Sequence, residues 1–296
     1  GNFIGVGADG ITPVSEAAVG GVGILMQSGA FANRIGGATE VERNIISGNE
    51  WSGVTIGGLG CEENVVQGNY IGVDALGNPL GNHMHGVLLS GTARNLIGGT
   101  QPGEGNVIAN NLWSGVVVGD DAQVNTVRGN SIYANGWLGI DLGADGVTDN
   151  DDDDADLGPN HLQNAPVLDL VLSGNSTLVG GKLSSEADAT FMIDFYASTA
   201  ADPSGFGEGQ RHLGLTVVTT DANGDASFEV ALPAATTSTD WVTATATAEA
   251  TASTSEFSNA LLADGSDSVF IVANTNDAGS GSLRDASRSR ICRWRT

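Results

Sequence analysis

The chain has 296 residues, of which 44 are Gly and only 11 are Lys or Arg, against 35 Asp or Glu. So much Gly disfavours a helical protein, because each Gly weakens a helix interior by about 1 kcal/mol relative to Ala. The net charge of −24 disfavours nucleic acid and anionic membrane surfaces as partners. No apolar run approaches the length of about 18 residues that a spanning helix needs, so we expect no membrane insertion.

An eight-residue pattern recurs through the first half of the chain: Asn-x-(Trp/Met)-x-Gly-(Val/Ile)-x-(Ile/Leu/Val), with copies that begin at Asn49, Asn82, Asn111 and Asn135. A second pattern, Asn-x-(Ile/Val)-x-Gly-(Gly/Asn), begins at Asn33, Asn64, Asn95 and Asn125. Repeats of about 20–50 residues indicate a solenoid. Because each unit holds three short strands and no helical periodicity, we predict a parallel β-helix with apolar side chains inside. Asn amides of neighbouring coils are expected to bond to one another.

From residue 165 the pattern changes to longer segments with alternating polarity, separated by turn sequences such as Asp221-Ala-Asn-Gly-Asp225. Six strands are predicted, over 167–172, 177–183, 190–197, 212–219, 226–232 and 242–248. That number of antiparallel strands within about 100 residues is typical of a β-sandwich.

Three segments of the repeats are especially regular: Gly-Asn-Tyr70-Ile-Gly-Val-Asp-Ala-Leu-Gly, Asn95-Leu-Ile-Gly-Gly-Thr and Gly105-Asn-Val-Ile. They resemble the right-handed parallel β-helix repeats of large secreted and surface proteins of bacteria. The stretch from Gly139 to Asn164 is similar to the closing segment of such helices, which in that family leads into an immunoglobulin-like sandwich. Residues 274–286 are similar to the opening motif of a further module. After Ala286 the sequence departs from the family.

The resemblance and the patterns together imply an all-β chain. We expect a right-handed parallel β-helix of about five coils in residues 1–144, an acidic linker loop in 145–164 and an antiparallel immunoglobulin-like β-sandwich in 165–263. Residues 264–296 are expected to begin a further module and to end in a disordered or non-native basic tail, 287–296. The resemblance implies an extracellular or cell-surface location.

The linker is the most acidic part of the chain. Carboxylates so densely placed repel one another unless a cation lies among them, and hard oxygen ligands favour Ca²⁺. The spacing does not follow the helix-flanked Ca²⁺ loop, and a solvated acidic joint is the alternative. The predicted ligands are Asp145, Asp149, Asp151, Asp153 and Asp156.

The aromatic position of the first pattern holds Trp51, Met84, Trp113 and Trp137. Neighbouring strands are about 4.8 Å apart, so these side chains are expected to form one row. Rings that face outward would offer a platform for glycan stacking. Rings that face inward, or that stack on one another, would only stiffen the bend. The glycan-stacking candidates are Trp51, Trp113 and Trp137.

An enzyme is a further alternative, because β-helices often host polysaccharide lyases and glycosidases. Hydrolysis needs two carboxylates about 5–9 Å apart, and the weak candidates are Asp120, Asp121 and Asp141. The repeats show no interruption of the kind that a catalytic site would impose. We therefore favour a protein that is not an enzyme.

Self-assembly is the third class of function considered. An apolar segment follows the sandwich and resembles the first strand of a next module; its residues Val269, Phe270, Ile271 and Val272 are the predicted assembly strand. The expected partners are further copies of this chain, joined end to end, or adjoining modules of a longer chain. The sequence thus predicts a structural or adhesive module, and its alternative is a protein that binds or cleaves polysaccharides.

Overall fold

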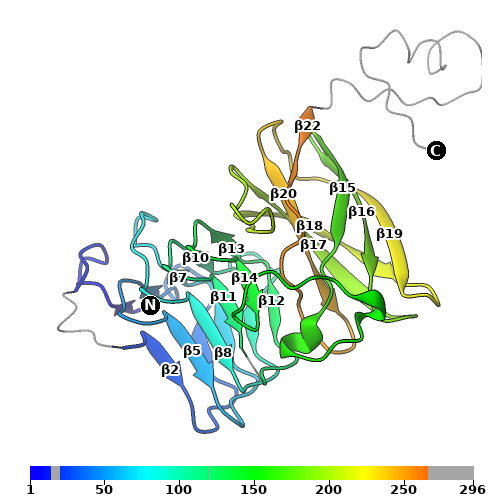
Figure 1. Cartoon of the computed structure of the whole chain (residues 1–296). Helices are drawn as coiled ribbons and strands as arrows, with labels where there is room; N and C mark the ends of the chain where they lie inside the picture. The colour runs from blue at the N-terminus through cyan, green and yellow to red at the C-terminus, as the bar shows by residue number, and fades with distance from the viewer. Residues whose placement is uncertain (15–20, 120, 266–296) are drawn as a thin grey trace, which may run out of the picture.

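The computed structural model describes residues 1–14, 21–119 and 121–265. The predicted assembly strand 269–272, the basic tail 287–296 and Asp120 lie outside these ranges. The described chain is all-β, with stacked parallel sheets in its first half and a separate antiparallel region in its second half (Figure 1).

The first half is called here the parallel unit (residues 1–142). Its successive strands belong in turn to three parallel sheets, and one set of strands, one from each sheet, is called a round. The first sheet contains β1 (Phe3–Ile4), β4 (Ile45–Ile46), β7 (Tyr70–Ile71), β10 (Val107–Ala109) and β13 (Ser131–Tyr133). The second contains β2 (Ile24–Met26), β5 (Val54–Gly57), β8 (Val87–Ser90), β11 (Val116–Val118) and β14 (Ile140–Leu142). The third contains β3 (Arg34–Gly36), β6 (Val65–Gln67), β9 (Leu96–Gly98) and β12 (Thr126–Arg128).

Equivalent positions of the repeat pair in register across the rounds. In the second sheet Val54 pairs with Val87, Val87 with Val116, and Val116 with Ile140. These four side chains are at most 2% exposed, and the apolar residues of the other two sheets join them in one core. Each fully buried Val, Leu or Ile contributes about 1.5–3 kcal/mol, so the repeated strands stabilise the unit chiefly by burial.

Three rows of Asn run along the bends between the sheets. In each row, Oδ1 of one Asn accepts hydrogen bonds from the backbone N and from Nδ2 of the Asn in the preceding round. The Nδ2–Oδ1 distances that join neighbouring Asn side chains are 2.7–3.0 Å. The predicted amide bonds between coils are therefore present. The rows are Asn2–Asn44–Asn69–Asn106–Asn130, Asn33–Asn64–Asn95–Asn125 and Asn49–Asn82–Asn111–Asn135.

Glycine is required where a bend meets the next round. Gly72 has φ +88, and a Cβ atom at this position would lie 1.9 Å from the backbone oxygen of Ala109. Only a residue without a side chain fits this approach and this left-handed backbone.

The second half, called here the antiparallel unit (residues 167–265), has two four-stranded sheets. One has the order β19-β16-β15-β22 and the other β18-β17-β20-β21. The six predicted strands are all present, with ends shifted by at most one residue. The bounds are β15 Val167–Ser173, β16 Thr177–Ser184, β17 Thr190–Ser198, β18 Arg211–Thr219, β19 Asp225–Leu232, β20 Trp241–Ala248, β21 Leu261–Leu262 and β22 Asp264–Gly265. A core around Phe191, Ile193 and Phe195 lies between the sheets.

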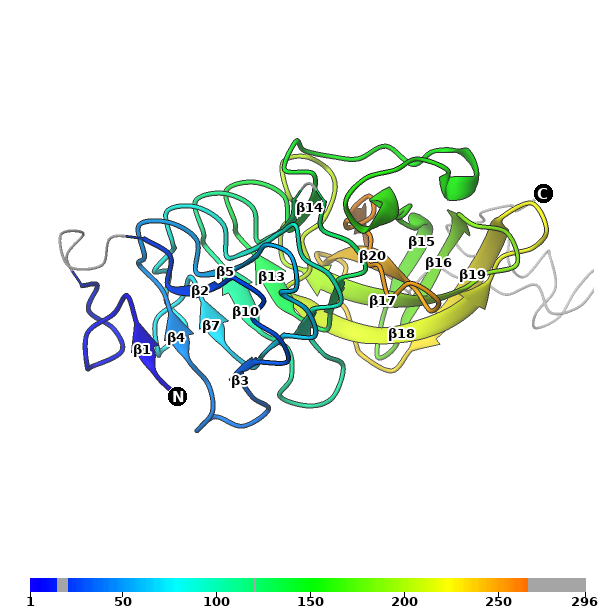
Figure 2. The same ribbon diagram turned by 90° about the horizontal axis from the view of Figure 1, so that it is seen from below.

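Strands β17 and β20 lie against the last round of the parallel unit, beside β13 and β14 (Figure 2), and Arg128 of β12 forms an ion pair with Asp194 of β17. Tyr196 and Phe257 of the antiparallel unit belong to the core of the parallel unit. Backbone bonds also cross the junction, since Ile132 and Gly209 exchange two bonds of 2.8 and 2.9 Å. At Ile132 the edge of the last round is therefore paired with the antiparallel unit.

The acidic segment between the units is ordered by contacts. It contains two short 3₁₀ turns, η1 (Asp152–Asp154) and η2 (Pro159–Leu162). Asn160 in η2 is completely buried, and its Oδ1 accepts the backbone N–H of Asn125 at 2.8 Å. Asn160 thus continues the row of Asn33, so the second half of the predicted linker packs as the start of a further round.

Candidate functional site

The aromatic row faces outward. Backbone bonds join Met84 to Trp51, Trp113 to Met84, and Trp137 to Trp113, at 3.1–3.4 Å, so each round contributes one residue to the row. The Trp51, Trp113 and Trp137 residues are 54%, 41% and 54% exposed. The row is therefore accessible on the surface of the bend, ahead of the second sheet.

Two of the rings also stack on each other. The centroids of Trp113 and Trp137 are 6.1 Å apart with an interplanar angle of 21°, which is an offset-stacked pair. The His85 ring meets Trp113 edge-on, with centroids 5.2 Å apart. Among the described residues no aromatic ring stacks on Trp51. The structure thus combines the two arrangements considered above for these rings: the row is exposed, and its last two rings stack on each other.

His85 lies beneath this row and is 6% exposed. Burial lowers the pKa of its imidazole to about 4, so the ring is neutral at pH 7. Its Nδ1 has no hydrogen-bond partner among the described residues. The nearby His83 is exposed, so the two imidazoles lie in different environments.

Three carboxylates of the acidic segment come together. Ligand atoms of Asp151, Asp154 and Asp156 all lie within 4.8 Å of one another. Of the predicted ligands, Asp151 and Asp156 belong to this group, whereas Asp145, Asp149 and Asp153 are exposed and outside it. The sequence-based set omitted Asp154. Asp154 belongs to the same run of Asp residues as the predicted ligands, but its contact with Asp151 and Asp156 arises only from the fold of the segment around η1.

Asp154 is held by the antiparallel unit and by the end of the acidic segment. Its Oδ2 accepts bonds from Ser185 Oγ and, at 2.6 Å, from Gln163 Nε2, and its Oδ1 accepts the backbone N–H of Asn164 at 3.0 Å. Burial, with the charges of Asp151 and Asp156, raises the pKa of Asp154 to about 6. Oδ1 atoms of Asp151 and Asp156 are buried without a hydrogen-bond partner among the described residues. Such a set of hard oxygen atoms has the chemistry of a Ca²⁺ ligand set.

A separate pair of carboxylates, Asp141 and Glu256, lies at the junction of the two units. Asp141 in β14 is completely buried, and its Oδ2 accepts a bond from Ser114 Oγ at 2.9 Å. Glu256 reaches over from the antiparallel unit and accepts bonds from the backbone N–H groups of Leu142 and Thr148, at 2.9 and 3.0 Å. Burial raises the pKa of both carboxyls; that of Glu256 rises to about 7, with the Asp141 charge adding to the effect.

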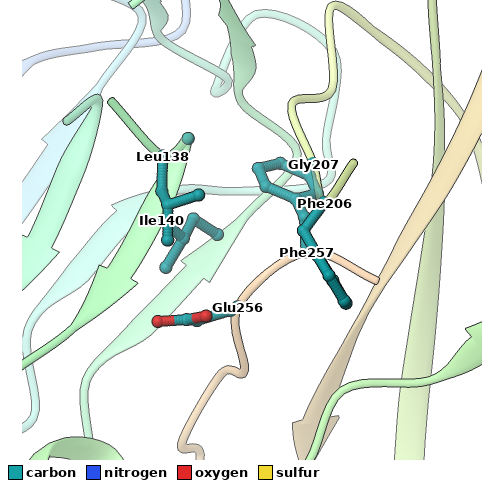
Figure 3. Close-up of a pocket in the computed structure, with 7 residues that line it drawn as sticks. Leu138, Ile140, Phe206, Gly207, Glu256 and Phe257 are labelled. Carbon is teal, nitrogen blue, oxygen red and sulfur yellow. The ribbon is translucent and has the colours of Figure 1, made fainter. Parts of the chain in front are cut away.

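Figure 3 shows the crevice beside Glu256, which Leu138, Ile140, Phe206, Gly207 and Phe257 also line. Its apolar side chains fill the space and leave no room for a water molecule. A larger opening of about 330 Å³ lies at the first round, beside the Arg34–Glu42 ion pair of 3.6 Å. Neither space has the walls of a closed substrate pocket.

The weak catalytic candidates are not brought into a shared cleft in the described part of the chain. Asp121 is exposed and adopts φ 61, whereas Asp141 is buried and bonded to Ser114. A glycosidase acid must reach the oxygen of a bound sugar. The burial of Asp141 therefore does not favour this role.

A comparison with models of known protein families finds no match to this chain, and a comparison with curated protein sequences finds none either. No helix in the described ranges is both long and apolar enough to cross a membrane. The geometry of the chain's own residues must therefore support any functional proposal.

Proposed function

We propose that this chain is a structural module of a secreted or cell-surface protein. In this proposal the three parallel sheets close into a right-handed β-helix of about five coils, and the antiparallel sheets form an immunoglobulin-like sandwich that caps its last coil. The observation that carries the proposal is the continuity of the junction. One row of Asn ends on Glu208 of the antiparallel unit. Another ends on Asn160, whose Nδ2 donates to the backbone oxygen of Thr254, so hydrogen bonds continue both rows into the antiparallel unit.

This continuity supports a scaffold because buried backbone groups and apolar side chains resist bending between the units. Solution scattering in dilute protein tests the proposal. We expect one rigid, elongated particle whose scattering curve fits the described coordinates without a hinge. Scattering that requires independently moving units would contradict it.

We further propose that copies of this chain, or adjoining modules, associate through strand addition by Val269, Phe270, Ile271 and Val272, as the sequence pattern predicts. Electron microscopy at rising protein concentration distinguishes a fibre subunit from a monomer. A chain that stays monomeric and dispersed at every concentration would argue against assembly.

Ca²⁺ binding at the Asp151–Asp154–Asp156 cluster is proposed as part of this scaffold. The support comes from three carboxylates in one small volume, two of which have a buried oxygen without a hydrogen-bond partner in the described part of the chain. A bound cation would offset their repulsion and brace the segment between the units. The contacts of Asp154 with Ser185 and Gln163 already attach this cluster to the antiparallel unit.

The second candidate function is glycan binding by the aromatic row, favoured by the exposure of Trp51, Trp113 and Trp137. Because Trp113 and Trp137 cover part of each other, the open faces of Trp51 and of the outer end of the pair are the surfaces on which a pyranose ring would stack. Titration with soluble oligosaccharides, followed by Trp fluorescence, tests this candidate. Binding that survives Trp51→Ala and Trp137→Ala together would contradict it.

A further inference from the structure

The antiparallel unit has one long edge strand that is almost free of charged side chains. Its four edge strands are β18, β19, β21 and β22. The last two have only two residues each, and β19 carries exposed Asp225 and Glu229. By contrast, β18 has no Asp, Glu, Lys or Arg from Leu213 to Thr219. Short length and charge are the usual means by which edge strands avoid pairing with another chain, whereas β18 is long and carries a charged residue only at its first position, Arg211.

The outer edge of β18 has backbone N–H and C=O groups that can pair with a further strand. Within the described ranges, residues 212–219 form backbone hydrogen bonds to no strand except β17. Every second N–H and C=O of an edge strand points away from its only neighbour. Leu215 and Val217 on the same strand are 41% and 57% exposed, so the edge also presents apolar side chains.

The sequence of β18 is complementary to itself when two copies run antiparallel. A two-fold axis through Thr216 places Leu215 opposite Val217 of the second copy. The same register brings the end of β18 that carries Arg211, whose side chain is 48% exposed, to the end of the second copy that is followed by the exposed Asp221. Apolar pairs and opposite charges across antiparallel strands each contribute roughly 0.2–1 kcal/mol.

We propose that β18 is a self-association edge, at which a second copy of this chain adds its own β18 in antiparallel register around Thr216. The two β18-β17-β20-β21 sheets then form one continuous sheet. The two-fold axis is perpendicular to this continuous sheet, so the parallel units of both copies lie on the same face of the sheet. The −24 charge of each copy opposes association at low salt, and screening at about 0.15 M salt or above weakens this repulsion.

Pairing through β18 does not depend on the proposed scaffold function. A dimer through β18 can form whether or not the chain is a scaffold, and a scaffold can be monomeric. It also differs from strand addition by residues 269–272, because it needs no residue beyond β18 and the turn that follows.

The test compares two full-length variants with the same change in charge, by light scattering after size-exclusion chromatography in 0.15–0.5 M salt. Val217→Lys places like charges near one another across the proposed pair, and Ser227→Lys places the charge on an exposed position of β19. We expect the wild type and Ser227→Lys to dimerise with similar Kd, and Val217→Lys to weaken the dimer at least about tenfold. A monomeric wild type at millimolar concentration, or equal Kd for all three, would overturn the proposal. Matching thermal unfolding curves show that each variant is folded.

The register and the occupant are tested with two further comparisons. Thr216→Cys should form a disulfide between two copies on oxidation, because residue 216 of each copy lies opposite residue 216 of the other. Thr219→Cys should not cross-link, because residue 219 lies far from its counterpart in this register. The opposite pattern would refute the register. Ile271→Lys should leave the dimer unchanged. If it abolishes the dimer, residues 269–272 occupy the edge and the pairing of β18 with β18 is wrong.

Discussion

Glu208 accepts two hydrogen bonds from Asn135 with one oxygen: the backbone N and the Nδ2 of Asn135 both lie 3.0 Å from Oε1. In every earlier step of this row, the accepting atom is Oδ1 of the Asn one round further on. Glu208 lies 73 residues beyond Asn135, in the antiparallel unit. It thus replaces the missing next round, and its second oxygen accepts the N–H of Ala134 at 2.6 Å.

Replacing Glu208 with Ala should destabilise the protein by about 3 kcal/mol, because donors of Ala134 and Asn135 then lose their partner inside the junction. Glu208→Gln keeps one carbonyl oxygen for Asn135 and should cost less. Urea unfolding at pH 7 measures both changes. Equal stability of the wild type and Glu208→Ala would refute the capping role.

The inner steps of the Asn rows should matter more than their exposed ends. Asn95 is 1% exposed, accepts two bonds from Asn64 and donates to Asn125, so Asn95→Ala is expected to cost about 3 kcal/mol. Asn33 begins the same row on the surface. Its replacement by Ala is the matched control and should cost less than about 1 kcal/mol. Thermal unfolding of the two variants separates these outcomes, and equal losses would contradict the argument.

The stability of the protein should decrease as the pH rises from about 5 to 8. The pKa of Glu256 is raised from 4.5 to about 7 in the folded state, mainly by burial. Its stabilising contribution is therefore complete below pH 4.5 and is lost as the pH rises through about 7, with a total on the order of 3 kcal/mol. The raised pKa values of Asp141 and Glu208 act in the same direction. Unfolding free energies in urea across this range should show a smaller slope for Glu256→Gln. An unchanged slope would show that this carboxyl does not cause the effect.

The stacked tryptophans should contribute to stability, whereas the separate one should not. Trp137→Ala removes the ring that stacks on Trp113 and is expected to cost about 1 kcal/mol. Trp51→Ala is expected to change the unfolding free energy by no more than about 0.5 kcal/mol. Near-UV circular dichroism should lose the coupled Trp signal only in the first variant. Loss of that signal in Trp51→Ala would contradict the assigned pair.

Ca²⁺ should raise the unfolding temperature of the wild type, because a ligand that binds only the folded state stabilises it by mass action. Asp154→Asn should reduce this increase, since Asp154 belongs to the three-carboxylate cluster. Asp225→Asn, on the exposed end of β19, is the matched control and should respond like the wild type. Identical unfolding curves with Ca²⁺ and with a chelator would contradict the proposal that this cluster binds Ca²⁺.

The repeated positions of the parallel unit could be predicted because each round has the same bends, hydrogen bonds and buried strand faces, which require the same residue types. Gly accounts for the close bends, as at Gly72, and Asn is suited to accept and donate bonds along the row. Valine and isoleucine at alternate positions identify the buried face of each strand. The strands of the antiparallel unit were equally visible, because alternating polarity and turn sequences are local signals.

The junction could not be predicted in this way. Glu208 and Glu256 occur in segments with no motif, and their partners lie 73 and 114 residues away. Likewise, the choice of Asp154 among the acidic residues depends on Ser185 and Gln163, which directly follow β16 and η2. The outward direction of the aromatic row was also left open by its spacing.

The high Gly content and the repeats by themselves determined an all-β chain with stacked parallel strands, because backbone geometry and side-chain alternation act over a few residues. Only the tertiary structure decided which carboxylates are buried, which of them gather, and where the last round ends. Those outcomes depend on desolvation and on hydrogen bonds between segments far apart in the chain, and no local pattern of residues encodes them.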